Sequence, residues 1–193
     1  MLKIENKSPL KFLKLYKVDL KFIPSIIVLA ISLVFFKFGL DNLLIEILKI
    51  NVPIDVSNDN ELYFWSIIHI VFLAPICEEI FFRGIIFTKL KYIIPNSLAI
   101  ITQAFIFGSF HGGLSGDIVR VLLSIISGVI FALLYNYTNN LTISILFHSF
   151  SNILVMLLSL LTFDINSILS IIISFLFLLL YIILIKYNKN NLN

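Results

Sequence analysis

Long apolar runs alternate with short polar segments along this chain, and most of the runs are long enough to cross a lipid bilayer. Six runs can be distinguished, at residues 22–38, 62–90, 97–111, 118–137, 141–161 and 165–186. A membrane helix needs about 20 apolar residues because each residue advances it by about 1.5 Å. The second run exceeds one straight crossing, and Pro75 offers a place for it to kink. The pattern predicts an all-α, polytopic membrane bundle of about six transmembrane helices.

The amino-acid composition is that of a membrane protein. Of its 193 residues, 60% are hydrophobic and 13% are charged, whereas soluble domains are typically about half apolar and a quarter charged. Cys77 is the single cysteine, which excludes an intramolecular disulfide and a cysteine-rich metal site. We expect one membrane domain over residues 22–186, between a basic arm at 1–21 and a short tail at 187–193.

The first 21 residues carry a regular series of lysines at helical spacing, namely Lys3, Lys7, Lys11, Lys14, Lys17 and Lys21. This spacing predicts an amphipathic interfacial helix that lies on anionic lipid, with a disordered basic tail as the alternative. Nucleic acid is not an expected partner, since no aromatic or base-reading surface accompanies the lysines. The first apolar run is followed by no A-x-A cleavage site, so we expect it to remain as an anchor.

Charges in the loops predict the orientation of the bundle. The segment after the first run carries acidic residues, namely Asp41, Glu46, Asp55, Asp59 and Glu61, against the single Lys49. The N-terminal arm, the turn at Lys89 and Lys91, and the C-terminal tail are basic. By the positive-inside rule both termini are predicted to be cytoplasmic, which requires an even number of spans.

Ionisable groups within the apolar runs point to chemistry, since a charge at mid-bilayer costs about 2.5–3.5 kcal/mol. Glu79 and Arg83 are four residues apart and are predicted to form an ion pair on one helix face. Glu78 is rotated by about 100° from Glu79 and is left to face another partner. His111 ends the third run, while His148 and Asn152 share a face of the fifth.

One carboxylate, two imidazoles and one carboxamide on three helices suit the activation of water. Glu78, helped by His111, could act as the general base of amide hydrolysis, while His148 and Asn152 donate hydrogen bonds to the oxyanion. Alternatively, Glu78, His111 and His148 could hold a zinc ion with water in the open position. The sequence leaves both versions open.

The pattern Glu78-Glu79-x-x-x-Arg83, Phe107-x-x-x-His111 and His148-x-x-x-Asn152 resembles the three motifs of the CAAX-processing and bacteriocin-processing peptidases, the CPBP or Abi family. The resemblance covers residues 75–152 and implies an α-helical intramembrane endopeptidase. It implies water activation by Glu78 and His111, and oxyanion stabilisation by His148 and Asn152. It leaves Glu79 and Arg83 as supporting residues, with a catalytic share for Glu79 open. A zinc-dependent and a metal-free glutamate mechanism are both argued for this family.

Amino-acid usage suggests the source and the substrate. The abundance of Lys, Ile, Asn and Phe is typical of an AT-rich genome such as that of a low-GC Gram-positive bacterium. Among the substrates of this family, we therefore expect a leader-bearing or bacteriocin-type peptide in the cell membrane rather than a prenylated CAAX protein.

Other functions compete with this interpretation. Gly113-Leu114-Ser115-Gly116 matches the GxSG of rhomboid serine proteases, with His148 as base, but leaves Glu78 and His111 unexplained and has a loop composition. A non-catalytic immunity or scaffold protein of the same fold is the main alternative. A transporter is disfavoured because no paired broken helices indicate inverted repeats.

Three smaller features complete the predictions. His69 is placed outside the site, and Arg120 is expected to form an exposed pair with Asp117. The small residues Ser124, Gly128 and Ala132 predict a close-packing face on the fourth helix. His111 comes at the far end of its helix. It can meet Glu78 only if that helix tilts strongly, starts below the membrane surface, or ends short of the far face, which Gly112 and Gly113 would permit.

Overall fold

The computed structural model describes residues 13–49, 60–112, 117–161 and 165–190. In this part of the chain all regular structure is helical: a short 3₁₀ turn at Leu20–Phe22, then α2 (Ile23–Leu48), α3 (Asn60–Ile68), α4 (Ala74–Glu79), α5 (Thr88–Leu90), α6 (Asn96–Gly112), α7 (Ile118–Thr138), α8 (Leu141–Leu160) and α9 (Ser167–Asn190). π-Helical segments at His69–Leu73 and Ile80–Phe87 join α3, α4 and α5. The all-α helical bundle predicted from the sequence is confirmed.

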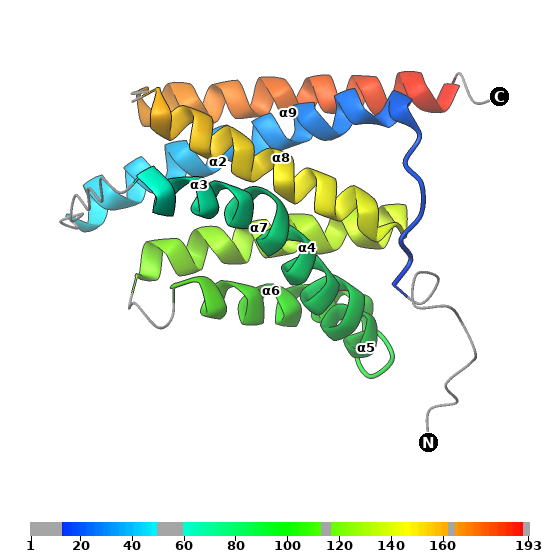
Figure 1. Cartoon of the computed structure of the whole chain (residues 1–193). Coiled ribbons are helices and arrows are strands. Elements are labelled where there is room, and N and C mark those ends of the chain that lie inside the picture. The colour runs from blue at the N-terminus through cyan, green and yellow to red at the C-terminus, as the bar shows by residue number, and fades with distance from the viewer. Residues whose placement is uncertain (1–12, 50–59, 113–116, 162–164, 191–193) are drawn as a thin grey trace.

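Helices α2 and α9 form one side of the bundle and run antiparallel (Figure 1). Ser32 Oγ donates to the Ser174 carbonyl oxygen at 3.0 Å, and Ser170 Oγ donates to the Phe35 carbonyl oxygen at 2.8 Å. Gly39 lies so close to α9 that an added Cβ would stand 2.7 Å from the Ser167 carbonyl oxygen. Small residues and hydroxyl-to-backbone bonds are the usual means of helix association in lipid.

Helices α6 and α7 form a second antiparallel pair, held together by the predicted small-residue face. Ser124, Gly128 and Ala132 are buried, and a Cβ on Gly128 would lie 3.0 Å from the Ala104 Cα atom. On the α6 side, a Cβ on Gly108 would lie 2.8 Å from the Val121 carbonyl oxygen. The close-packing prediction for the fourth helix is confirmed.

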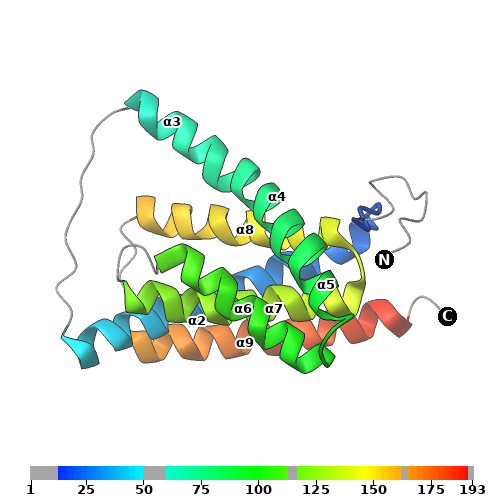
Figure 2. The same ribbon diagram turned by 90° about the horizontal axis from the view of Figure 1, so that it is seen from below.

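The long second run folds as successive α- and π-helical segments that cross the other helices obliquely (Figure 2). Pro75 is the second residue of α4 and directly follows the π-helical segment at His69–Leu73. The backbone at Leu73 and Ala74 is right-handed helical, so the helix continues past Pro75, and a π-helical turn rather than a break accompanies the proline. π-Helical turns change the direction in which side chains point and often occur at functional sites.

Four helices are long and apolar enough to cross a membrane among the described residues, namely Leu20–Leu48, Ile118–Thr138, Leu141–Leu160 and Ser167–Asn188. The predicted runs at 62–90 and 97–111 are helical but do not meet this criterion. The former is divided into short segments, and α6 has 17 residues with Gln103 and Ser109 among them. Conversely, the first span continues well past its predicted end at residue 38.

The predicted interfacial helix of the arm is wrong for the part that the structure describes. Residues 15–19 have no helical structure, and Lys14 has a positive φ of 56°. The reason is a tertiary contact with the turn between α7 and α8: the Leu141 amide donates to the Lys14 carbonyl oxygen at 3.0 Å, and Asn140 exchanges hydrogen bonds with the Tyr16 backbone. Lys3, Lys7 and Lys11 lie outside the described residues.

Aromatic and aliphatic side chains of α2, α6, α7 and α8, together with Phe82, fill the centre of the bundle. The buried cluster comprises Ile26, Ala30, Leu33, Phe82, Phe107, Phe131, Leu134 and Phe147. The motif residues extend from this cluster, so their positions depend on the packing of several helices.

Candidate active site

The Glu79–Arg83 ion pair is buried beneath the site. Both side chains have 0% exposure, and Arg83 Nη1 lies 2.9 Å from Glu79 Oε1. The Arg83 guanidinium is held between the rings of Phe107 and Phe131, at 4.4 Å and 4.9 Å from their centroids. It also donates to the Gly128 carbonyl oxygen at 3.4 Å. The predicted ion pair is confirmed, and it connects α4 to α6 and α7.

Glu79 also orients His148. Its Oε1 atom accepts a hydrogen bond from His148 Nδ1 at 3.0 Å, since an ionised carboxylate has no proton to donate. A neutral imidazole carries one N–H, so this bond leaves His148 Nε2 as an acceptor. That nitrogen lies 3.8 Å from Glu78 Oε2. A buried carboxylate that fixes the tautomer and direction of a histidine is a common support in hydrolytic sites.

His111 reaches the same carboxylate oxygen from the other side. Its Nδ1 atom lies 2.9 Å from the Phe107 carbonyl oxygen, one turn earlier on α6, and its Nε2 atom lies 3.4 Å from Glu78 Oε2. The Phe107 ring packs against the imidazole with centroids 4.2 Å apart. Helix α6 ends one residue later at Gly112, so His111 meets Glu78 within the bundle.

Glu78, His111 and His148 therefore converge on one point. Both imidazoles use Nδ1 as donor, so both present the Nε2 lone pair to the Glu78 carboxylate. Three acceptors that face one another need a donor among them, either a proton or a bridging water molecule. The separations of 3.4 Å and 3.8 Å exceed a direct hydrogen bond and suit bridging by water. The Glu78 side chain is 26% exposed, so a substrate can reach it from the surface of the bundle.

Asn152 has a different immediate partner from the one predicted. Its Nδ2 atom donates to the Ile70 carbonyl oxygen at 2.8 Å. Ile70 belongs to the first π-helical segment, so this bond ties α8 to the helix that carries Glu78. The carboxamide has a second N–H, which leaves one donor for another acceptor. Asn152 thus lies beside the imidazoles while also holding two elements of the site together.

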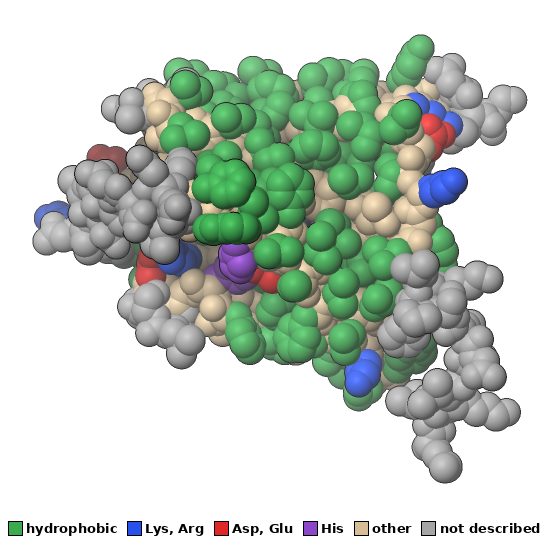
Figure 3. Space-filling view, viewed as in Figure 1, with side chains coloured by type: hydrophobic (Ala, Val, Ile, Leu, Met, Phe, Trp, Pro, Cys, Tyr) green, Lys and Arg blue, Asp and Glu red, His purple; other side chains and the backbone are tan. Residues whose placement is uncertain are grey.

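A small polar pocket of about 90 Å³ lies against these residues, between α2, α6, α7 and α8. His111, His148 and Asn152 line it together with Ser124, Ser127, Ser151 and Lys37. Figure 3 shows histidine and charged side chains in an otherwise hydrophobic surface, beside grey residues that are not described.

Lys37 is a residue of this site that sequence reasoning missed. It lies in the interior of α2, which runs from Ile23 to Leu48, and it lines the polar pocket. Its charge lies close enough to His111 and Asp41 to interact with both. The signal was present in the sequence as a lysine in an apolar run, but ending that run at residue 38 placed Lys37 at its margin.

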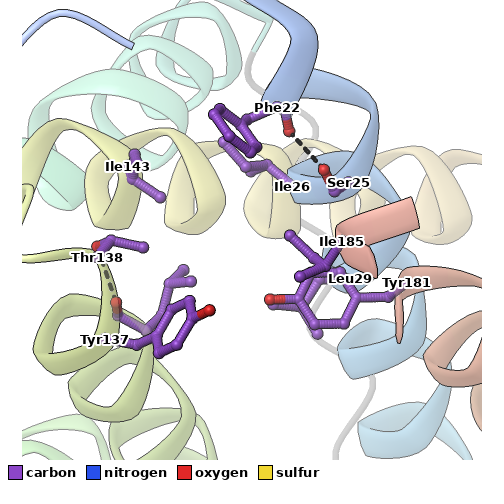
Figure 4. Close-up of a pocket in the computed structure, with 10 residues that line it drawn as sticks. Phe22, Ser25, Ile26, Leu29, Tyr137, Thr138, Ile143, Tyr181 and Ile185 are labelled. Carbon is purple, nitrogen blue, oxygen red and sulfur yellow. Dashed lines mark hydrogen bonds between the residues drawn. The ribbon is translucent and has the colours of Figure 1, made fainter. Parts of the chain in front are cut away.

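A separate pocket of about 280 Å³ between α2, α7, α8 and α9 has a different chemistry (Figure 4). Its wall is hydrocarbon, with Phe22, Ile26 and Ile143 among the lining residues, apart from the polar tips of Ser25, Thr138 and two tyrosines. None of the described residues that line it is a carboxylate, an imidazole or a cation, so the candidate chemistry lies in the smaller polar pocket.

Among the described residues, no group of three His, Cys, Asp or Glu side chains is assigned as a metal site. The Nε2 atoms of His111 and His148 still lie 3.4 Å and 3.8 Å from Glu78 Oε2, so the choice between a zinc-dependent and a metal-free mechanism stays open. Ser115 of the rhomboid motif lies outside the described residues. Arg120 and Asp117 form the expected exposed pair at 3.6 Å.

Comparison with known proteins points to the same segment of the chain. Residues 60–154 match the family described as type II CAAX prenyl endopeptidase Rce1-like, and this segment holds every motif residue. The match supports the resemblance to the CPBP family that the motifs indicated. It is 33% identical over 169 residues to an uncharacterized protein of Mycoplasma capricolum subsp. capricolum, over 79% of this chain and 48% of that protein. The chain thus spans about half the length of this curated relative. No solved structure matches it significantly.

Proposed function

We propose that the chain is an intramembrane endopeptidase in which Glu78 and His111 activate water to hydrolyse a peptide bond. The observation that carries this proposal is the convergence of His111 Nε2 and His148 Nε2 on Glu78 Oε2, at 3.4 Å and 3.8 Å. The buried Glu79–Arg83 pair supports that geometry. The match of residues 60–154 to the Rce1-like family supports a peptidase of the CAAX type.

The first step is attack by water on the substrate carbonyl carbon. A water molecule between Glu78 and His111 donates one hydrogen bond to each, and Glu78 takes its proton as the new C–O bond forms. Glu78 is assigned as the group that takes the proton because its Oε2 atom lies at the point on which both imidazoles converge. The carbonyl π electrons move to oxygen and create the oxyanion.

Two donors are available for that oxyanion. His148 Nε2 can donate to the oxyanion once the imidazole carries a second proton, and the Glu79 carboxylate at Nδ1 stabilises that imidazolium. The second N–H of Asn152 is the other donor, since the first is bound to Ile70. Loss of one oxyanion donor typically lowers kcat about 10²–10³-fold. The intermediate then collapses, the C–N bond breaks, and Glu78 returns its proton to the leaving amine.

The expected substrate is a membrane-associated peptide or protein segment, for example a bacteriocin-type or leader-bearing peptide of a bacterium. The site lies between helices of a membrane bundle, and most of the surrounding surface is hydrophobic (Figure 3). In the proposed membrane orientation, both termini face the cytoplasm. The exposed side chains of Lys17 and Lys21 then lie near anionic lipid headgroups.

Product analysis in isotopically labelled water tests the proposal. The purified protein is reconstituted in lipid with a panel of membrane-inserting peptides in H₂¹⁸O, and fragments are analysed by mass spectrometry. Hydrolysis predicts one ¹⁸O in each new carboxyl group, and Glu78→Gln abolishes the fragments. Cleavage that survives Glu78→Gln contradicts the proposal, as does biological activity of that variant without cleavage, which indicates a binding protein of the same fold.

A further inference from the structure

Hydrolysis inside a helical bundle requires a supply of water to a site surrounded by hydrocarbon. The Phe107 and Phe131 rings pack against His111 and His148, with centroids 4.2 Å and 4.6 Å apart. Each turnover consumes one water molecule, so the centre needs a route by which water is replaced. The polar pocket beside the imidazoles has the chemistry and size of such a route.

The pocket lining offers both donors and acceptors to water. Ser127 and Ser151 each donate the hydroxyl proton to a carbonyl oxygen one turn earlier, Leu123 and Phe147, at 3.0 Å and 2.8 Å. Their oxygen lone pairs are therefore left for other donors. The Lys37 ammonium supplies donors on the α2 side. A site needs about two to four polar partners for each bound water, and this lining provides them.

The pocket also has enough room. Its volume is about 90 Å³, and one water needs about 10–15 Å³ of such space. On that scale it holds a small group of waters in contact with one another. The pocket in Figure 4 is larger, at about 280 Å³, but its wall is hydrocarbon, and apolar cavities of that kind do not hold ordered water.

A groove of about 380 Å³ lies beside the polar pocket. Val34, Lys37 and Val155 line both spaces, so these three residues stand at the boundary between them. Asp41 and Ser159 line the groove and not the pocket. Lys37 therefore places a charged group at an otherwise aliphatic boundary.

We propose that this polar pocket is a water-binding site, filled through the groove past Lys37 and Val155, that supplies the nucleophilic water to the Glu78 centre. The proposal rests on the proposed hydrolytic function for its purpose, but the hydration of the pocket stands on its lining and volume. It gives Ser124, Ser127 and Ser151 a role as water-positioning residues that never contact the substrate.

Cysteine labelling tests hydration independently of activity. In a Cys77→Ala background, Ser151→Cys places a thiol in the pocket, and Ser144→Cys places one two turns earlier on the same face of α8. Ser144 is also buried but does not line the pocket, so it is a matched control. The probe is methanethiosulfonate ethylammonium, a small cation that reacts with thiolates in water. Because an inaccessible buried thiol is inert, we expect the Ser151→Cys variant to react at least about tenfold faster than Ser144→Cys.

Val155→Trp tests the route. Val155 is 49% exposed, so a larger side chain can be placed at the boundary without entering the core. Combined with Ser151→Cys, we expect it to slow labelling of the pocket thiol about tenfold or more, as for a thiol that loses contact with water. In the otherwise native chain, the same substitution lowers kcat for any cleaved peptide, while Val155→Leu retains most activity.

The possible results separate the two proposals. Equal labelling of the Ser151→Cys and Ser144→Cys variants contradicts a hydrated pocket, whether or not the protein cleaves peptides. Fast labelling of Ser151→Cys that Val155→Trp leaves unchanged contradicts entry through the groove. Fast, Val155-dependent labelling in a protein that cleaves nothing supports the hydrated pocket and contradicts the hydrolytic function instead.

Discussion

Substitutions in the buried Glu79–Arg83 pair can separate effects on the stability of the fold from effects on catalytic activity. Arg83→Met removes a guanidinium with no solvent exposure, which is 2.9 Å from Glu79 and lies between two phenylalanine rings. It leaves the Glu79 carboxylate buried with His148 as its remaining partner. Breaking a buried ion pair in this way costs about 3–5 kcal/mol. We therefore expect Arg83→Met to lower the free energy of unfolding by about that amount.

Removing both charges at once is expected to restore the stability that Arg83→Met loses. The double variant Glu79→Leu/Arg83→Met has no uncompensated charge, and replacement of a buried pair by apolar residues is often close to neutral. We expect it to regain most of the lost stability. It does not regain activity, because His148 loses the carboxylate that fixes its Nδ1 proton at 3.0 Å. Loss of such a support lowers activity about 10- to 100-fold.

The assay combines unfolding in detergent with peptide cleavage for the wild type, both single variants and the double variant. The reasoning predicts strong destabilisation of Arg83→Met, near-native stability of the double variant and low kcat in both. A double variant that is as unstable as Arg83→Met refutes the uncompensated charge as the cause. A double variant that is stable and fully active refutes the orienting role of Glu79.

Three further predictions concern packing, the Asn152 bond and metal. Gly108→Ala places a Cβ 2.8 Å from the Val121 carbonyl oxygen, so we expect a loss of about 1–3 kcal/mol and a lower Tm. Gly84→Ala is the control, because its Cβ meets the end of a flexible side chain, Leu13 Cδ2, at 3.0 Å and no backbone atom closer than 3.9 Å. Equal Tm values of the two variants contradict the close backbone contact. Asn152→Ala removes both the bond to Ile70 and an oxyanion donor, so kcat falls about 10²-fold or more with KM less affected; a change confined to KM contradicts this. Treatment with a strong chelator leaves cleavage unchanged, and loss of activity that zinc restores contradicts the metal-free mechanism.

Local spacing in the sequence was enough to predict the contacts made within one helix. Glu79 and Arg83 are four residues apart and form the expected pair, and the rotation of about 100° leaves Glu78 free for other partners. The small residues of α7 likewise predicted a close-packing face, which lies against α6. Each of these features depends on helix periodicity alone, which the pattern of residues determines.

Features that depend on tertiary contacts were missed or placed wrongly. The lysines of the arm have helical spacing, but Asn140 and Leu141 hold the backbone of Lys14 and Tyr16 in a non-helical conformation. Asn152 bonds to the Ile70 carbonyl oxygen, a backbone partner that no spacing rule could indicate. The importance of Lys37 became apparent only when α2 was found to continue to Leu48, which places that lysine inside the bundle.

The central claim is that the Glu78 carboxylate performs the hydrolysis. Its most direct test is kcat for one cleaved peptide in lipid vesicles, compared between the wild type, Glu78→Gln and Glu46→Gln. Glu46 is an exposed residue near the end of α2, so its variant controls for the loss of one acidic group. The account predicts native kcat for Glu46→Gln and a decrease of about 10²–10⁴-fold for Glu78→Gln, with equal Tm values in all three proteins. Native kcat in a folded Glu78→Gln variant contradicts it.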